Sequence, residues 1–283
     1  MLSGLLILRC NVPVEKPKKQ RLDELLIEHN FFETKSKAQA AIMAGDVKID
    51  DKVITKAGFQ IAYNSKLKIE IKTMPYVSRG GYKIEKAIKT FGINLKDRVC
   101  LDAGASTGGF TDCMLQNGAK KVYAVDVGFN QLAWKLIQDK WVKNIEKTNI
   151  KNAEFSQIYA DNEEVADFCV MDISFISITK VLNNLKKLLK EDFEIATLIK
   201  PQFEAGKEDV GNGVIKDEKI HIKILNNLIK FFDENGFVLL GLTYSPIKGP
   251  KGNIEYLAYL KNSGERINID INELVSKAFD YAV

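Results

Sequence analysis

A glycine-rich stretch, Leu101–Phe110, contains the residue types that point most directly to chemistry. It reads Leu-Asp-Ala-Gly-Ala-Ser-Thr-Gly-Gly-Phe, which predicts an apolar strand that turns into a helix. Glycines let a backbone approach a ligand closely, and the first turn of a helix offers N–H groups without intrahelical partners. The stretch is not a Walker loop, because no Gly-Lys-Ser/Thr follows. It also departs from the G-x-G-x-x-G dinucleotide pattern, because Ser106 replaces the middle glycine.

An acidic residue, Asp126, ends the next apolar run. A carboxylate at this place in an α/β fold accepts hydrogen bonds from ribose hydroxyls. A glycine turn followed by such an acid predicts a nucleoside-containing cofactor without a clamped pyrophosphate, of which S-adenosylmethionine is the usual one. The alternative is a tight strand-to-helix turn that binds no ligand.

Charged residues also stand at the ends of other apolar runs. Asp172 closes the run Phe-Cys-Val-Met, and Lys200 closes Ile-Ala-Thr-Leu-Ile. Ligands bind at the carboxyl edge of open α/β sheets, so both residues are candidates for chemistry, although a strand that exits to water would also end in lysine. Lys83 follows a Gly-Gly turn and Glu255 opens the last run. Taken singly these two are weak signals, because most Lys and Glu side chains are solvated.

The elements that must position these residues follow an alternation of apolar runs and helix-length segments. Such alternation predicts an α/β fold, a Rossmann-like, mostly parallel sheet with helices on both faces. The runs are residues 99–102, 121–126, 142–147, 166–172, 194–200, 237–244 and 254–260.

The front of the chain has a different pattern. Two short helices, one from Gln20 and one over Ser36–Ala44, precede strands at Val47 and at Lys66–Lys72, which predicts a small α+β module. The sequence thus predicts a disordered leader over 1–17, the α+β domain over 18–73, a Pro- and Gly-containing linker over 74–81, the α/β domain over 82–265 and a C-terminal tail over 266–283.

Composition and charge narrow the class of protein. The chain has 283 residues, 46% hydrophobic and 28% charged, which is typical of a soluble globular protein. Residues 1–90 contain 17 Lys and Arg against 10 Asp and Glu, and the remainder contains 24 against 27. This asymmetry predicts a polyanion-binding module in front of a mildly acidic body, and a solvated lysine-rich surface is the alternative.

Other function classes lack the residues they need. Four scattered cysteines without C-x-x-C spacing argue against a zinc site and a disulfide framework. Two histidines leave little for a His-based metal site or a Ser-His-Asp hydrolase. No apolar run approaches the ~20 residues of a membrane-spanning helix, and no secretory signal is evident, so we expect a cytoplasmic protein.

Four motifs in order closely resemble the TlyA, or hemolysin A, family. They are Ser78–Lys83, Asp102–Phe110, Met171–Phe175 and Leu198–Glu204, and the resemblance extends from about Gln20 to Leu260. Members of this family pair an N-terminal S4-type RNA-binding domain with a methyltransferase domain similar to the FtsJ/RrmJ ribose 2′-O-methyltransferases.

The resemblance implies roles for individual residues. Lys83, Asp172, Lys200 and Glu255 would form the Lys-Asp-Lys-Glu tetrad of 2′-O-methyltransferases. Lys200 would contact the ribose 2′-hydroxyl, either to take its proton or to steer its lone pair as a cation, with Asp172 orienting Lys200 and Glu255 holding Lys83. S-adenosylmethionine would contact Asp102, Gly104, Ala105, Ser106, Gly108, Gly109 and Phe110, with Asp126 at its ribose and Asn149 near its adenine.

The front module would bind RNA. Arg21, Lys35, Lys37 and the linker residue Arg79 would contact phosphates, which fix the register of the RNA more than they read its sequence. Lys37 stands where the family usually has arginine, and the change weakens bidentate recognition. Tyr76 either stacks on a base or packs at the domain interface.

The implied function is S-adenosylmethionine-dependent ribose 2′-O-methylation of ribosomal RNA at cytidines. Its partners would be ribosomal RNA or ribosomal subunits, with no metal and no stable membrane association. Two alternatives stay open: a non-enzymatic RNA-binding or ribosome-assembly factor, and a membrane-active hemolysin.

Overall fold

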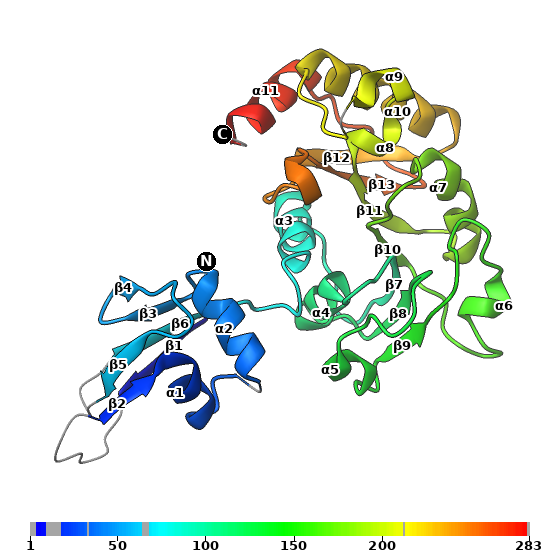
Figure 1. The fold of residues 1–283 in the computed structure, drawn as a ribbon. Coiled ribbons are helices and arrows are strands. Elements are labelled where there is room, and N and C mark those ends of the chain that lie inside the picture. Colours follow the sequence, from blue (N-terminus) through cyan, green and yellow to red (C-terminus); the bar gives the residue numbers. More distant parts are fainter. Residues whose placement is uncertain (1–3, 10–17, 33, 64–67, 212, 282–283) are drawn as a thin grey trace. The chain divides into compact units, whose positions relative to one another are not determined.

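The chain divides into two compact units, residues 1–75 and residues 76–283, called here the amino-terminal and the carboxyl-terminal unit. The computed structural model describes residues 4–9, 18–32, 34–63, 68–211 and 213–281 (Figure 1). The boundary between the units falls inside the segment that the sequence predicts as a linker.

The amino-terminal unit packs two short helices on small antiparallel sheets. One sheet has the order β1-β6-β3-β4, and β2 pairs with β5. Leu22, Leu25 and Ile42 of the helices are fully buried against Val47 and Ile71 of the strands. The elements are β1 (Gly4–Arg9), β2 (Lys18–Arg21), α1 (Leu22–Glu28), α2 (Lys35–Met43), β3 (Val47–Ile49), β4 (Lys52–Val53), β5 (Gln60–Tyr63) and β6 (Lys68–Thr73).

Part of the predicted disordered leader is a strand. β1 pairs antiparallel with β6 in continuous register, from Gly4 opposite Thr73 to Arg9 opposite Lys68. The prediction of disorder is therefore wrong for these six residues. The physical reason is that a run of Leu and Ile favours an extended strand, and that the edge of β6 offers backbone N–H and C=O groups for it to hydrogen-bond with. The rest of the predicted leader lies outside the described residues.

The carboxyl-terminal unit contains a seven-stranded sheet with the order β12-β13-β11-β10-β7-β8-β9. Neighbouring strands from β11 to β9 are parallel, while β13 runs antiparallel to both β11 and β12. This arrangement confirms the predicted α/β class. The strands are β7 (Val99–Ala103), β8 (Lys121–Val125), β9 (Val142–Ile145), β10 (Phe168–Met171), β11 (Glu194–Ile199), β12 (Val238–Tyr244) and β13 (Tyr256–Lys261).

Helices cover both faces of this sheet (Figure 1). Alternate strand residues face opposite ways, so Leu101 belongs to the core cluster that includes residues of α7, α10 and α11, while Cys100 belongs to the cluster that includes residues of α3 and α4. The helices are α3 (Gly81–Phe91), α4 (Gly109–Gln116), α5 (Trp134–Ile137), α6 (Phe155–Ile158), α7 (Thr179–Leu185), α8 (Pro201–Glu204), α9 (Lys207–Val210), α10 (Glu218–Glu234), α11 (Ile271–Tyr281) and the 3₁₀ turns η1 (Lys186–Leu188) and η2 (Pro250–Gly252). Among the described residues, none of these helices has the length and apolarity needed to cross a bilayer.

The segment before α3 is part of the carboxyl-terminal unit. Tyr76 is buried and meets Tyr82 edge to face, with 5.7 Å between ring centroids. A side chain on Gly81 would place Cβ 2.3 Å from the Tyr76 ring, so only glycine fits beside it. Because Tyr76 packs inside its own unit, it is not exposed for stacking on a base.

The predicted C-terminal tail contains α11. Leu274, Val275 and Ala278 of α11 are buried in the same core cluster as α10. This segment therefore contributes to the fold of the carboxyl-terminal unit rather than extending from it.

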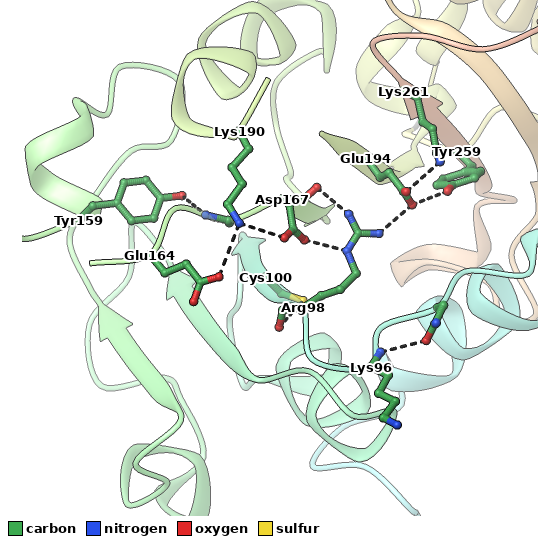
Figure 2. Close-up of polar contacts among 12 residues, drawn as sticks. Lys96, Arg98, Cys100, Tyr159, Glu164, Asp167, Lys190, Glu194, Tyr259 and Lys261 are labelled. Carbon is green, nitrogen blue, oxygen red and sulfur yellow. Dashed lines mark hydrogen bonds and ion pairs between the residues drawn. The ribbon is translucent and has the colours of Figure 1, made fainter. Parts of the chain in front are cut away.

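A charged network joins the strand ends at one edge of the sheet (Figure 2). The guanidinium of Arg98 lies 2.7 Å from Asp167 and 2.9 Å from Glu194. Lys190 lies 3.3 Å from Asp167, and Lys261 lies 2.8 Å from Glu194. These residues flank the amino ends of β7, β10 and β11. The network therefore lies at the edge of the sheet opposite to the carboxyl ends of β10 and β11, which Asp172 and Lys200 follow.

Candidate active site

The four charged residues singled out in the sequence converge on one place. Nζ of Lys83 lies 2.7 Å from Oε2 of Glu255 and 3.4 Å from Oδ2 of Asp172. Oδ1 of Asp172 lies 2.6 Å from Nζ of Lys200. The side chains thus form a continuous row of alternating charge, Glu255, Lys83, Asp172, Lys200.

Strand direction explains the convergence. β10 and β11 are parallel, so Asp172 and Lys200, which follow them, reach the same edge of the sheet. β13 is antiparallel to β11, so Glu255, which precedes β13, reaches this edge as well. Lys83 comes from the first turn of α3, which packs against β12 and β13.

The row is largely removed from water. Glu255 is 1% exposed, Lys83 7% and Lys200 8%. Burial raises the pKa of Glu255 above its ordinary value, although the neighbouring ammonium of Lys83 acts in the opposite direction. A buried charge is tolerated only when it is paired, so each member of the row holds its neighbour in place.

The cavity beside this row has a volume of about 540 Å³, within the range of small-molecule sites. Its wall continues from the four charged residues to the glycine-rich loop without leaving the carboxyl-terminal unit. The lining residues from the loop are Gly104, Ala105, Ser106, Thr107, Gly109 and Phe110, and those near the charged row include Ser78, Arg79, Ser174, Phe175, Gln202, Phe203, Lys248, Gly249 and Asn253.

The glycine-rich loop is fixed against the catalytic edge. Gly104 has φ +92°, and a Cβ there would lie 2.7 Å from the carbonyl oxygen of Asp172. Gly108 has φ +90°, and a Cβ there would overlap Leu136. Larger residues would therefore push the loop away from the Asp172 backbone. This close contact sets the distance between the loop and the charged row.

Asp102, at the end of β7, lies behind the loop rather than in the cavity wall. It is fully buried, and its Oδ2 accepts a hydrogen bond from the Thr111 hydroxyl at 2.6 Å. Burial raises the pKa of Asp102 to about 7, despite the opposing hydrogen bond from Thr111. Asp102 therefore supports the start of α4 behind the loop and does not line the cavity.

Asp126 and Asn149 also lie outside the lining of the cavity. The Asp126 carboxylate accepts hydrogen bonds from the backbone N–H groups of Ser106 at 2.8 Å and Gly128 at 2.7 Å. A carboxylate has about four acceptor positions, so Asp126 keeps capacity for a ribose. Asn149 is exposed, and its Oδ1 accepts from the Lys151 N–H. The Thr148 N–H donates to the Asp126 carbonyl at 2.9 Å, so the structure places Asn149 directly after a residue bonded to Asp126, outside the cavity lining.

Two aromatic side chains that the sequence reasoning did not single out line the cavity. Phe175 is 91% exposed with φ +66°, and its ring lies 5.2 Å from that of Phe203. The Glu204 carboxylate accepts hydrogen bonds from the Ser177 hydroxyl and the Ile178 N–H, which joins the two loops that carry these rings. Both rings lie inside the quoted motifs, but only the tertiary structure shows that they pair and that Phe175 is exposed.

Ser174 and Gln202 were missed in the same way. The Ser174 hydroxyl accepts a hydrogen bond from Nζ of Lys200 at 2.8 Å, so Lys200 is held by two groups from the loop after β10. Gln202 follows β11 by three residues and has a buried Oε1.

The proposed RNA contacts of the amino-terminal unit lie close together, but two of them are ion-paired. Arg21 makes two hydrogen bonds to the fully buried Asp23, at 2.9 and 2.7 Å, and Lys35 lies 2.8 Å from Glu24. Lys37 is exposed on the first turn of α2. Arg79, which the sequence places in the linker, belongs to the carboxyl-terminal unit, where it is exposed and lines the cavity.

Comparison with known proteins adds independent findings. Residues 76–262 match the FtsJ-like methyltransferase family, and residues 20–62 match the S4 domain. Hemolysin A of Brachyspira hyodysenteriae is 46% identical over 84% of this chain and 98% of its own length. The 16S/23S rRNA (cytidine-2′-O)-methyltransferase TlyA of Mycobacterium tuberculosis is 36% identical over 88% of this chain and 92% of its own length.

A solved structure shares the whole architecture. A protein of Streptococcus thermophilus, provisionally assigned as a hemolysin, superimposes with a TM-score of 0.72 at 42% identity, covering 94% of this chain and 97% of that one.

Proposed function

This chain belongs to the FtsJ-like methyltransferase family, within its TlyA and hemolysin A group, and we propose that it transfers methyl groups from S-adenosylmethionine to ribose 2′-hydroxyls of ribosomal RNA cytidines. The observation that carries the proposal is the single cavity shared by the glycine-rich loop and the charged row. Residues 18–73 would be the RNA-binding domain and residues 82–265 the catalytic domain.

The loop and the cavity suit the cofactor. The backbone of Gly104, Ala105 and Ser106 lines the cavity at the end of a parallel strand, where α/β folds bind nucleosides. Asp126, behind Ser106, would accept from the ribose of the cofactor. S-adenosylmethionine supplies an electrophilic methyl group on a sulfonium. The cavity extends beyond the loop to Lys200, which leaves space for a nucleotide.

Lys200 would position the nucleophile. Its ammonium has Asp172 at 2.6 Å and Ser174 at 2.8 Å, and one of its three N–H donors remains for the 2′-oxygen. Held by these two groups from the loop after β10, the Lys200 ammonium would orient the lone pair of the hydroxyl. Such positioning supplies a large part of the rate of a bimolecular reaction. The hydroxyl proton then leaves to water as the methyl group is transferred.

Lys83 and Glu255 would act one step further from the reacting atoms. Lys83 fixes the second oxygen of Asp172, and Glu255 balances the charge of Lys83. This keeps the carboxylate of Asp172 turned toward Lys200.

The target nucleotide would enter beside Phe175 and Phe203. Exposed aromatic rings bind unpaired bases by stacking, which suits single-stranded or flipped nucleotides in RNA. The amino-terminal unit, with Lys35, Lys37 and Arg21, would bind RNA phosphates. An enzyme acting on ribosomes would be cytoplasmic.

The test is transfer of labelled methyl groups from S-adenosylmethionine to purified ribosomal subunits and to naked ribosomal RNA. We expect transfer by the wild type, loss with Lys200→Ala, and a product that resists alkaline cleavage at the modified nucleotide. No transfer by a folded protein that binds RNA would favour an assembly factor. Lysis of red cells by wild type and Lys200→Ala alike would favour the lytic activity after which a relative is named.

A further inference from the structure

Gln202 lines the active-site cavity, and the oxygen of its carboxamide is buried in the cavity wall without a hydrogen-bond partner among the described residues. A buried carbonyl oxygen without a donor is costly, because it has lost its hydrogen bonds to water. A ligand with an N–H group at this point would remove the cost.

The backbone holds Gln202 in place. It lies in α8, directly after Lys200, where Pro201 is buried and Glu204 binds the loop after β10 through Ser177 and Ile178. The turn is therefore anchored on both sides of Gln202. An anchored turn limits the positions that the Gln202 side chain can reach, which suits it to recognise one edge of a base.

The neighbours of Gln202 indicate what kind of group it meets. Lys200, which would contact the 2′-hydroxyl, precedes Gln202 in the sequence. Phe203, whose ring contacts that of Phe175, follows it. All four residues line the same cavity. A nucleotide with its ribose at Lys200 and its base at the aromatic pair would bring an edge of the base to Gln202.

We propose that Gln202 selects the target base by accepting a hydrogen bond from an exocyclic amino group, which in cytosine is N4. This assignment rests on the proposed function and specifies its substrate. Uracil has the carbonyl oxygen O4 at that position, so two acceptors would face each other. A site built to pair with a substrate N–H rejects an analogue that lacks it, because its own buried atom stays unpartnered.

The experiment compares two substrates and three variants of Gln202. The substrates are ribosomal subunits carrying either the mapped target cytidine or uridine at that position, and kcat/KM for methyl transfer is measured for each. The wild type should prefer cytidine by about tenfold or more. Gln202→Met, which keeps the volume without the acceptor, should lose about tenfold on cytidine and little on uridine, so the preference largely disappears. Gln202→Glu, which keeps an acceptor, should retain the preference, and Gln202→Asn, with a shorter reach, should weaken it.

A matched control is Gln157→Met, the same chemical change on the exposed helix α6, which should leave both rates unchanged. The dissociation constant of S-adenosylmethionine should stay the same in all variants. An unchanged preference in Gln202→Met would overturn this assignment while leaving methylation intact. Absence of methylation by the wild type on every substrate would instead overturn the proposed function, and the assignment with it.

Discussion

Nζ of Lys83 lies 2.7 Å from Oε2 of Glu255, and both side chains are buried. Glu255 stands at one end of the row and Lys200 at the other, so we expect its contribution to be to keep Lys83, and through Lys83 the carboxylate of Asp172, in one orientation. The length of this row makes the outermost carboxylate a sensitive probe of the site.

We expect Glu255→Gln to lower kcat by about 100-fold, because Lys83 would shift toward Asp172 and small misplacements near reacting atoms have effects of this size. Binding of RNA and of S-adenosylmethionine should change little, since neither is held by Glu255. Steady-state kinetics with separate binding measurements would distinguish the effects. Glu265→Gln, at an exposed position, is the control. A kcat near that of the wild type would show that Lys83 and Asp172 keep their places without the carboxylate.

The stability of the ligand-free protein should depend on pH through Asp102. Burial raises its pKa from 3.8 to about 7. Between these values the folded state binds a proton that the unfolded state has lost, so the contribution of Asp102 to stability falls as pH rises and levels off above about 7. Asp102→Asn removes the titration.

The gain in Tm from Asp102→Asn should therefore be larger at pH 8 than at pH 5, by several degrees, because each kcal/mol shifts Tm by about 2–4 °C in a chain of this size. Asp97→Asn, at an exposed turn, should give the same small difference at both pH values. An equal gain from Asp102→Asn at pH 5 and pH 8 would mean that this carboxyl group ionises normally.

Arg21 should contribute to the stability of the amino-terminal unit as well as to the binding of RNA. The hydrogen bond from Arg21 is the main cause of the low pKa of Asp23, about 2 against an ordinary 3.8. The stabilisation is therefore present above pH 3.8 and is lost as pH falls toward 2. At pH 7, Arg21→Ala should reduce the protection of residues 18–73 from hydrogen exchange, and by more than Lys35→Ala does, because Asp23 loses a hydrogen-bonded partner.

Lys35→Ala is the comparison for Arg21. Its ion pair with Glu24 is half exposed, so we expect a stability loss below about 1 kcal/mol. Affinity for ribosomal RNA should nevertheless fall, with a shallower dependence on salt, since one phosphate contact is removed. RNA binding that is unaffected by Lys35→Ala would move the phosphate-binding surface away from α2.

Arg98→Met should lower stability without changing the chemistry. It removes the cation that lies between Asp167 and Glu194 at the edge of the sheet opposite the charged row (Figure 2). Asp167 and Glu194 would each keep a lysine partner but lose the charged hydrogen bonds of the guanidinium between them, at a cost of about 2 kcal/mol. Denaturant unfolding and kcat at a temperature well below Tm measure the two effects. Lys96→Met, an exposed neighbour, should alter neither, and a large fall in kcat for Arg98→Met would indicate that the two edges of the sheet are coupled.

Much of the fold follows from local pattern. Each predicted strand of the carboxyl-terminal unit is present, because apolar runs of this length between helix-length segments have few other stable arrangements. Asp172 and Lys200 were recognisable for the same reason, since a charged residue that ends a buried strand of a parallel sheet lies at its ligand-binding edge.

Other features depend on tertiary contacts that no local pattern encodes. Lys83 and Glu255 resemble ordinary surface residues in the sequence, and the family resemblance alone indicated their roles. The open face of the Phe175 ring and the buried oxygen of Gln202 arise from how two loops meet. The strand β1 was missed because its partner, β6, is about sixty residues away and the pairing is non-local.

The position of β13 in the sheet affects the order in which the sheet and the charged row are completed. β12 is made before β13 but bonds to the sheet only through it, and Glu255 stands at the start of β13. While the chain emerges from the ribosome, residues up to 250 contain Lys83, Asp172 and Lys200 but neither the inserted strand nor the balancing carboxylate. The strand that joins β12 to the sheet is thus also the strand that brings the balancing carboxylate, so the docking of β13 completes the sheet and the charged row in the same step.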